Sequence, residues 1–309
     1  MGKLLNTRFW GYIGRFSLLF VLTWIAATMV FFMIQNSMGE MNRIALDLYE
    51  PFRPVSLSSL IPQLIRALVF ALILYPYYDI ILNSRYGKWI LFGALWGAAL
   101  LGSVEPMPGS IEGMIYVQIT FYEHFLVLSI ISIQVLLFVW LFFRWESSYG
   151  QYELMVKPGD LKGYVRRFTV VHVVTYWVVG SAFYQISGYE EALASMEIFQ
   201  LWRPLESLSM VLVVFLGQFF RGPFLALLLY PFLSVYIQKK YGWLYLFVLM
   251  FGLTALGSPI FISELLVFET TLPRYLESLL VGIPEIFAQM LLFSILFFFW
   301  QKKTVFPTH

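Results

Sequence analysis

Residues 208–237 read LSMVLVVFLGQFFRGPFLALLLYPFLSVYI, and their single charged residue is Arg221. An apolar run of this length can cross the roughly 30 Å hydrocarbon core of a bilayer as a helix. The run is continuously apolar, whereas a strand of a membrane barrel alternates between apolar and polar residues. The segment therefore predicts a transmembrane helix that carries a charge inside its apolar length.

The whole chain shares the composition of this segment. Of its 309 residues, 60% are hydrophobic and 12% are charged, against roughly 45–50% and about 25% in soluble domains. The formal net charge of +2 is too small for a basic field that would attract nucleic acid. Composition excludes an ordinary cytosolic enzyme and a disordered chain, and it predicts a multi-pass membrane protein in contact with the lipid bilayer.

Eight apolar runs predict an all-α, polytopic membrane helix bundle with eight transmembrane helices. The third and seventh runs are short, and thinning of the lipid or shielding by protein can accommodate them. The sixth run is long, and tilt of the helix can accommodate it. The expected helices cover residues 16–34, 57–82, 89–104, 125–143, 168–186, 208–237, 243–256 and 279–300.

The placement of charge predicts how this bundle is oriented. Positive residues collect on the cytoplasmic side of membrane proteins, and every lysine lies on the side that holds both termini. We therefore expect both termini in the cytoplasm and a place in the plasma membrane. The basic residues of that side are Lys3, Arg8, Arg15, Arg85, Lys88, Arg144, Lys157, Lys162, Arg166, Arg167, Lys239, Lys240, Lys302 and Lys303. The acidic residues of the outer side are Glu40, Asp47, Glu50, Glu105, Glu112, Glu123, Glu190, Glu191, Glu197, Glu206, Glu264, Glu269, Glu277 and Glu285.

Matching residues indicate that the chain contains one four-helix unit twice. The unit has an even number of spans, so its copies are expected to be parallel and related by an axis along the membrane normal. We expect repeats over residues 1–144 and 166–309, joined by a cytoplasmic linker over 145–165. The pairs 152 positions apart are Tyr12/Tyr164, Arg15/Arg167, Phe16/Phe168, Val21/Val173 and Thr23/Thr175; those 155 apart are Arg66/Arg221, Ala71/Ala226, Leu74/Leu229, Tyr75/Tyr230, Pro76/Pro231, Tyr86/Tyr241, Gly87/Gly242, Gly97/Gly252, Leu101/Leu256, Gly102/Gly257 and Ser103/Ser258.

Arg66 and Arg221 are the most informative charges, because each interrupts a long apolar run at a matching position. Arginine at the centre of a span costs about 2.5–3.5 kcal/mol on insertion scales, and less near its edge. The recurrence favours an interior role, in which the pair binds an anionic group or pairs with outer carboxylates to hold the repeats together. Independent extension of each side chain to the outer head groups is the alternative.

Four acidic residues are candidate partners for these arginines. With small shifts of register, Glu112 corresponds to Glu264 and Glu123 to Glu277. The segments that hold the first pair are rich in proline and glycine but remain apolar, and irregular backbone at membrane depth must be buried in protein or line water. The carboxylates could form an ion- or proton-handling site, or exterior ion pairs that contribute little individually.

Two further features concern helix geometry. The prolines of Tyr75-Pro76 and Tyr230-Pro231 interrupt the second and sixth helices, and we expect these positions to act as kinks or hinges. Gly97 recurs, among other small residues that let helices approach closely. The third and seventh helices are therefore expected inside the bundle, against each other.

Residue types that carry chemistry are scarce. The chain has no cysteine and three histidines, His124, His172 and His309, none of them a repeated pair. No nucleophile, phosphate-loop, zinc or dinucleotide signature stands out. We expect no metal, no cofactor and no catalytic residue.

Three functions fit these observations. The first is a transporter- or channel-like protein with an anionic-group or ion-handling site between the repeats near the outer leaflet. The second is a non-transporting membrane subunit or assembly factor that binds a membrane protein or a lipid. The third is a membrane-embedded enzyme that acts on a lipid-linked substrate. A small anionic or lipid ligand is compatible with all three.

Overall fold

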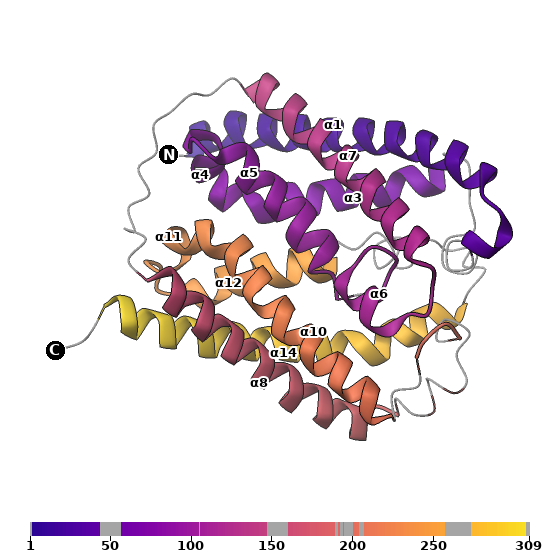
Figure 1. The fold of residues 1–309 in the computed structure, drawn as a ribbon. Coiled ribbons are helices and arrows are strands. Elements are labelled where there is room, and N and C mark those ends of the chain that lie inside the picture. Colours follow the sequence, from indigo (N-terminus) through magenta and orange to yellow (C-terminus); the bar gives the residue numbers. More distant parts are fainter. Residues whose placement is uncertain are drawn as a thin grey trace.

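The structure is a computed structural model that describes residues 2–43, 57–104, 106–146, 160–188, 191, 194, 200–203, 207–256 and 273–306. Every regular element among these residues is a helix, as the sequence predicts. Figure 1 shows two groups of helices, one from each half of the chain. The first half contains α1 (Gly2–Ser37), η1 (Glu40–Asn42), α3 (Leu57–Leu74), η2 (Tyr75–Tyr77), α4 (Tyr78–Asn83), α5 (Gly87–Phe92), η3 (Gly93–Leu101), α6 (Ile111–Tyr116) and α7 (Phe121–Glu146).

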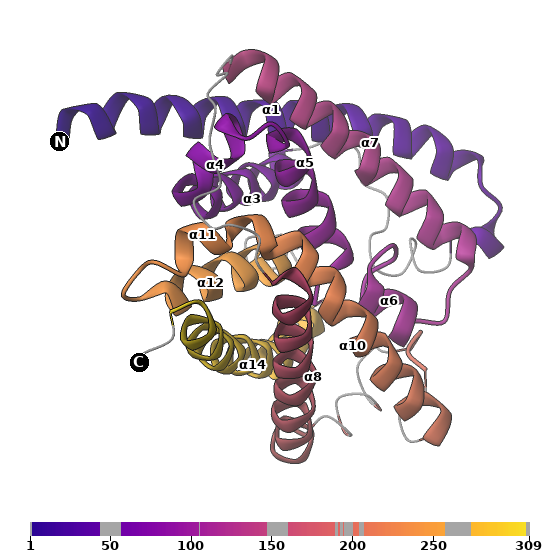
Figure 2. The ribbon, with the colours of Figure 1, turned by 60° about the vertical axis from the view of Figure 1, so that its left-hand side comes forward.

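The second half contains helices in a similar order. They are α8 (Leu161–Ile186), α10 (Leu208–Leu229), η5 (Tyr230–Phe232), α11 (Leu233–Tyr236), α12 (Gly242–Phe251), η6 (Gly252–Leu256) and α14 (Pro273–Val305). The segments η3 and η6 are π-helices that continue α5 and α12. In both views the start of α1 and the end of α14 lie at the same end of the bundle (Figures 1 and 2).

Five of the described helices are long and apolar enough to cross a membrane, which is compatible with a multi-pass protein. They are Arg8–Ser37, Ser59–Asn83, Phe121–Glu146, Leu208–Tyr236 and Gly282–Val305. Gly87–Leu101 and Gly242–Leu256 are shorter apolar helices. The expected span 168–186 lies within α8, which has 26 residues but is not among the five. The total of eight spans remains a prediction.

Proline breaks the α-helical hydrogen-bonding pattern where the sequence predicts it. Tyr75–Tyr77 and Tyr230–Phe232 are single 3₁₀ turns, each with its proline in the second position and a short helix after it. A proline has no backbone N–H, so it cannot donate the α-helical hydrogen bond to the carbonyl four residues earlier. The ring of Tyr75 lies 5.6 Å from that of Tyr12, and the ring of Tyr230 lies 5.0 Å from that of Tyr164. Hinge motion at these turns remains a prediction.

Phenylalanine rings fill the interior of each half. Phe16 of α1 lies 4.8 Å from Phe138 of α7, measured between ring centroids. Phe168 of α8 lies 4.7 Å from Phe293 of α14. All four side chains are almost completely buried. Edge-to-face pairs of this kind stabilise a core by about 0.5–1.5 kcal/mol beyond the area that they bury.

The two halves meet at the short apolar helices that end in η3 and η6, but the recurring glycines there pack against α10 and α3 rather than against each other. A Cβ atom on Gly97 would lie 2.4 Å from Leu228 of α10, and one on Gly252 would lie 2.1 Å from Ile73 of α3. Glycine at these two positions lets the side chains of Leu228 and Ile73 pack closely, and a Cβ atom there would force them to shift. The backbone N–H of Val104 also donates to the carbonyl of Thr254, at 3.0 Å.

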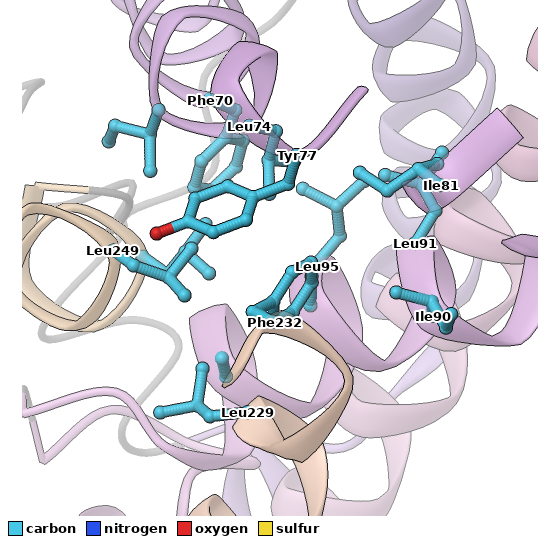
Figure 3. Close-up of a cluster of buried hydrophobic side chains, with 14 of the residues drawn as sticks. Phe70, Leu74, Tyr77, Ile81, Ile90, Leu91, Leu95, Leu229, Phe232 and Leu249 are labelled. Atoms are coloured by element: carbon cyan, nitrogen blue, oxygen red, sulfur yellow. The ribbon is translucent and has the colours of Figure 1, made fainter. Parts of the chain in front are cut away.

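A buried cluster of apolar side chains continues this contact (Figure 3). The rings of Tyr77 and Phe232, one from each half, have their centroids 4.9 Å apart. The hydroxyl of Tyr77 donates to the carbonyl of Tyr245 in α12, at 3.1 Å. Residues far apart in sequence thus form one core across both halves.

Candidate functional site

A tight turn before α6 positions the first of the predicted carboxylates. Gly109 adopts a positive φ of 85°, and its N–H donates to Nδ1 of His124 at 3.0 Å. Ser110 caps α6, because its Oγ accepts from the N–H of Gly113 at 2.8 Å. The turn and the cap fix Glu112 in the first turn of α6, which lies beside α10 in both ribbon views (Figures 1 and 2).

Glu112 forms a buried ion pair with Arg221, two residues that the sequence predicts as site residues. Nη1 of Arg221 and Nε2 of Gln218 both donate to Oε1 of Glu112, the latter at 3.0 Å. Glu112 is 4% exposed and Arg221 is 2% exposed. Arg221 lies near the middle of the apolar helix Leu208–Tyr236. The pair therefore joins the two halves in an apolar environment.

The guanidinium of Arg221 also binds the backbone of the first half. Its Nη2 donates to the carbonyl of Gly102 at 2.7 Å and contacts that of Ser103 at 3.4 Å. Its Nε has no hydrogen-bond partner among the described residues. Loss of one member of a buried ion pair typically costs about 3–5 kcal/mol, because the other charge is left uncompensated. The contacts of Arg221 therefore hold α10 against the first half, and Nε of Arg221 is the donor that has no partner among the described residues.

A histidine continues the polar contacts of Glu112. Gln218 is fully buried, and its Oε1 lies 3.1 Å from Nε2 of His172. Because the amide nitrogen of Gln218 donates to Glu112, its oxygen must accept, so Nε2 of His172 carries the proton. His172 is 3% exposed. The chain of contacts runs from α8 through α10 to α6.

Two tyrosines lie on the next turn of the same helices. The hydroxyls of Tyr116 and Tyr176 are hydrogen-bonded to each other. The rings of Tyr116 and Trp202 are stacked, with their centroids 5.2 Å apart. The backbone carbonyl of Tyr116 accepts from the N–H of Arg203 at 2.8 Å. Residues 200–203 of the second half therefore pack against α6 of the first.

The second predicted arginine has different contacts. Arg66 lies in α3 and is 7% exposed. Its guanidinium carbon lies 5.6 Å above the ring of Phe20 and 5.3 Å above the ring of Phe70. Cation–π contacts of this kind contribute about 0.5–2 kcal/mol, most where water is excluded. Neither predicted arginine extends to the exposed surface.

Of the other predicted carboxylates, the structure describes the side chain of Glu123 alone, and this side chain lies outside the Glu112 cluster. Glu123 is fully buried at the start of α7, where it forms a reciprocal cap with Thr120. Its backbone N–H donates to the hydroxyl of Thr120, and its carboxylate accepts from the backbone N–H of Thr120. Glu264 lies outside the described residues. Glu277 belongs to α14, but its side chain is not described.

Sequence reasoning missed four members of the cluster, namely Gln218, His172, Tyr116 and Tyr176. One signal was present: Gln218 precedes Arg221 by three residues, as Gln63 precedes Arg66. No group of three or more His, Asp or Glu side chains suited to a metal occurs within the described ranges.

The broad class of the protein follows from its helices. The chain is all-helical over its described length and compatible with an integral membrane protein. Comparison with protein-family models, with curated proteins and with solved structures found no match. Any narrower function must be argued from the residues of the site.

Proposed function

We propose that the protein is a transporter- or channel-like membrane protein whose ion- or proton-handling site is the pair Glu112–Arg221. The observation that carries the proposal is a nearly inaccessible ion pair between the two halves, next to the middle of a membrane-length helix. Ionisable residues inside membrane helices are costly, and they commonly mark ion or substrate pathways.

The architecture that we propose has eight spans, two parallel repeats and both termini in the cytoplasm. Its support is the similar order of elements in the two halves, together with the matched 3₁₀ turns and π-helices. The paired contacts Gly97–Leu228 and Gly252–Ile73 also obey the offset of 155 positions. Transporters built from repeats place their sites where the repeats meet.

Each member of the pair could bind an ion of opposite charge: the carboxylate of Glu112 could bind a cation or a proton, and the guanidinium of Arg221 could bind an anion. Oε1 of Glu112 accepts from both Arg221 and Gln218, so a proton on this carboxylate would weaken both contacts. Arg221 would then lose its counter-ion, while its Nε has no hydrogen-bond partner among the described residues. The proline turns Tyr75-Pro76 and Tyr230-Pro231 are the proposed hinges for the accompanying motion.

One contact favours the second function, a non-transporting subunit or assembly factor. The bond from Arg221 to the carbonyl of Gly102 ties the ion pair to the backbone, as in a permanent clamp. A clamp would need no ion to move. A membrane protein or lipid that copurifies in fixed stoichiometry would support this alternative.

Reconstitution into liposomes separates the two functions. The purified protein would be placed in vesicles of phosphatidylethanolamine and phosphatidylglycerol, and currents would be recorded on a solid-supported membrane. Gradients of H⁺, Na⁺, K⁺ and Cl⁻ would be applied in turn. The variants are Glu112→Gln, which keeps the shape of the side chain, and Glu123→Gln, which is the matched control.

The proposal expects a current for the wild-type protein that disappears in Glu112→Gln. The control should retain it, because glutamine serves at this capping position as well as glutamate does. Absence of current with every ion, or a current that survives in Glu112→Gln, would contradict the proposal. Thermal unfolding in detergent verifies that both variants are folded.

A further inference from the structure

Polar side chains continue along α8 beyond His172. His172, Tyr176 and Gly180 follow one another at intervals of four residues, and residues at this spacing lie on one face of a helix. In α6, Glu112 and Tyr116 have the same spacing. The hydroxyls of Tyr116 and Tyr176, which we call the tyrosine pair, are hydrogen-bonded to each other. The pair therefore joins the two helix faces one turn beyond Glu112.

A carboxylate of α14 lies at the end of this row. A Cβ atom on Gly180 would lie 3.2 Å from Oε1 of Glu285, so the Glu285 side chain is directed at that glycine. Glu285 is partly exposed and lies near the start of the apolar, membrane-length segment Gly282–Val305. Its carboxylate and that of Glu112 both act electrostatically on the Tyr116 hydroxyl. The tyrosine pair therefore lies between a buried carboxylate and a more accessible one.

The tyrosine pair has the chemistry of a proton relay in apolar surroundings. Both rings pack against a buried cluster that contains Ile115, Met210 and Val214. A phenolic hydroxyl can donate and accept a hydrogen bond, and either hydroxyl of the pair can be the donor. One hydroxyl can thus accept a proton from one side while the other releases its own proton on the other side. Both tyrosines are neutral before and after this exchange.

The positions of the first half that match this row carry no titratable group. At the repeat offsets of 152 and 155 positions, the residues that match His172, Tyr176 and Glu285 are Phe20, Trp24 and Ile130. None of these three has a carboxylate, a hydroxyl or an imidazole. The polar row is therefore not a requirement of the repeated fold.

We propose that Glu285 and the tyrosine pair form the route by which protons reach Glu112. This route rests on the proposed function and names the proton as the ion that moves. Glu285 takes up a proton and passes it to one hydroxyl of the pair, and the other hydroxyl releases its proton to the carboxylate of Glu112. One proton moves in total. At either end the transfer is direct or passes through one water molecule.

Proton-driven currents in the same vesicles test the route. The variants are Glu285→Gln, Tyr116→Phe and Tyr176→Phe, each of which removes one proton-carrying group and little volume. Each should lower the H⁺ current by about a hundredfold, the lower end of what a positioned acid or base contributes. Glu285→Asp should restore most of the current, because it keeps a carboxylate at this position. Thermal unfolding in detergent verifies folding, and the tyrosine variants alone decide the result if Glu285→Gln does not fold.

Two controls match these variants. Tyr164→Phe removes a hydroxyl from another tyrosine pair of α8, in which the hydroxyls of Tyr164 and Tyr236 lie 3.2 Å apart. Tyr164 is about 18 Å from Tyr176 along the helix, at 1.5 Å per residue. Glu40→Gln removes an exposed carboxylate. Both controls should keep the H⁺ current of the wild type.

The outcomes distinguish this route from the proposed function. A wild-type current that only another ion carries, or an H⁺ current that persists in any of the three folded variants, overturns the route while the site at Glu112 stands. Loss of the H⁺ current in Tyr164→Phe or in Glu285→Asp also overturns it, because the loss would then not follow the proton-carrying groups. Absence of current with every ion contradicts the proposed function, and the route with it.

Discussion

Arg221 and Arg66 occupy matching positions in the sequence but have different surroundings. Arg221 binds a carboxylate and two backbone carbonyls, next to a buried histidine. Arg66 lies above the rings of Phe20 and Phe70. A charge inside an apolar helix therefore predicts that its surroundings compensate the charge, but it does not predict whether a carboxylate, a carbonyl or an aromatic ring does so.

The opposite end of the bundle shows the reverse difference. Arg15 of α1 donates to the carboxylate of Glu146 at 2.6 Å, and Arg167 of α8 donates to the amide oxygen of Gln301 at 2.8 Å. Glu146 and Gln301 are 155 positions apart. Where the first half has the carboxylate of Glu146, the second half therefore has the neutral amide of Gln301, and the carboxylate that pairs with Arg167 is the more exposed Asp160, at 3.3 Å.

The largest expected effect follows from breaking the Glu112–Arg221 pair. Arg221→Leu or Glu112→Leu should each lower the free energy of unfolding by about 3–5 kcal/mol, because the remaining charge is buried without its counter-ion. The double variant should lose less than the sum of the two. Denaturant unfolding in detergent measures these energies, and strictly additive losses would show that the pair is not coupled.

Exchanging the residues beside the two arginines gives a smaller effect. His172→Phe should lower the free energy of unfolding by about 1–3 kcal/mol, because Oε1 of Gln218 loses its donor. Phe20→His should unfold at a higher temperature than its matched control Phe20→Leu, because the histidine can donate to Gln63. Oε1 of Gln63 has no hydrogen-bond partner among the described residues. The opposite order of the two melting temperatures would show that a histidine at position 20 does not donate to this oxygen.

A test at the opposite end concerns Glu146→Gln. Glu146 accepts from Arg15 and from the hydroxyl of Tyr78, and the Arg15 side chain is 30% exposed. With solvent screening we expect a loss of about 1 kcal/mol. The control Asp79→Asn removes an ion pair with Arg8 whose side chains are 59% and 65% exposed, and should have almost no effect. Equal losses in both variants would contradict the expected role of burial.

The smallest effect should be a pH dependence of the start of α8. The pKa of Asp160 is lowered chiefly because its carboxylate accepts from the N–H of Gly163, with a further contribution from Arg167. A lowered pKa stabilises the fold above the ordinary value of the carboxyl group and is lost as the pH falls through the lowered value. The Tm difference between wild type and Asp160→Ala should therefore shrink between about pH 6 and about pH 2. If the Tm difference between wild type and Asp160→Ala stays constant over this pH range, the hydrogen bond from Gly163 to the ionised carboxylate of Asp160 is not its cause.

Much of the fold could be predicted from apolar length and proline placement. The α-helical hydrogen-bonding pattern breaks at Pro76 and Pro231, and the close contacts at Gly97 and Gly252 are where small residues recur. These features are local or repeated, so sequence alone reveals them. The division of the apolar segments into five long helices and two short ones depends on length and hydropathy together.

The site could be predicted only in part. Glu112 and Arg221 were both recognisable as unusual charges, but their contact spans 109 positions of sequence. That contact depends on how α6 folds after the turn at Gly109 and on how closely α10 packs against it. His172 reaches the Glu112–Arg221 pair only through Gln218. A single histidine in an apolar helix gives no spacing or repeat from which this contact could be predicted.

The charge state of Glu112 is the premise shared by the stability predictions and the proposed function. Difference infrared spectra of the wild type and Glu112→Gln, recorded in lipid near neutral pH, report that state directly. We predict that the difference contains the bands of an ionised carboxylate, as the contact with Arg221 requires. A band from a protonated carboxylic acid in its place would contradict the ion pair and the site built on it.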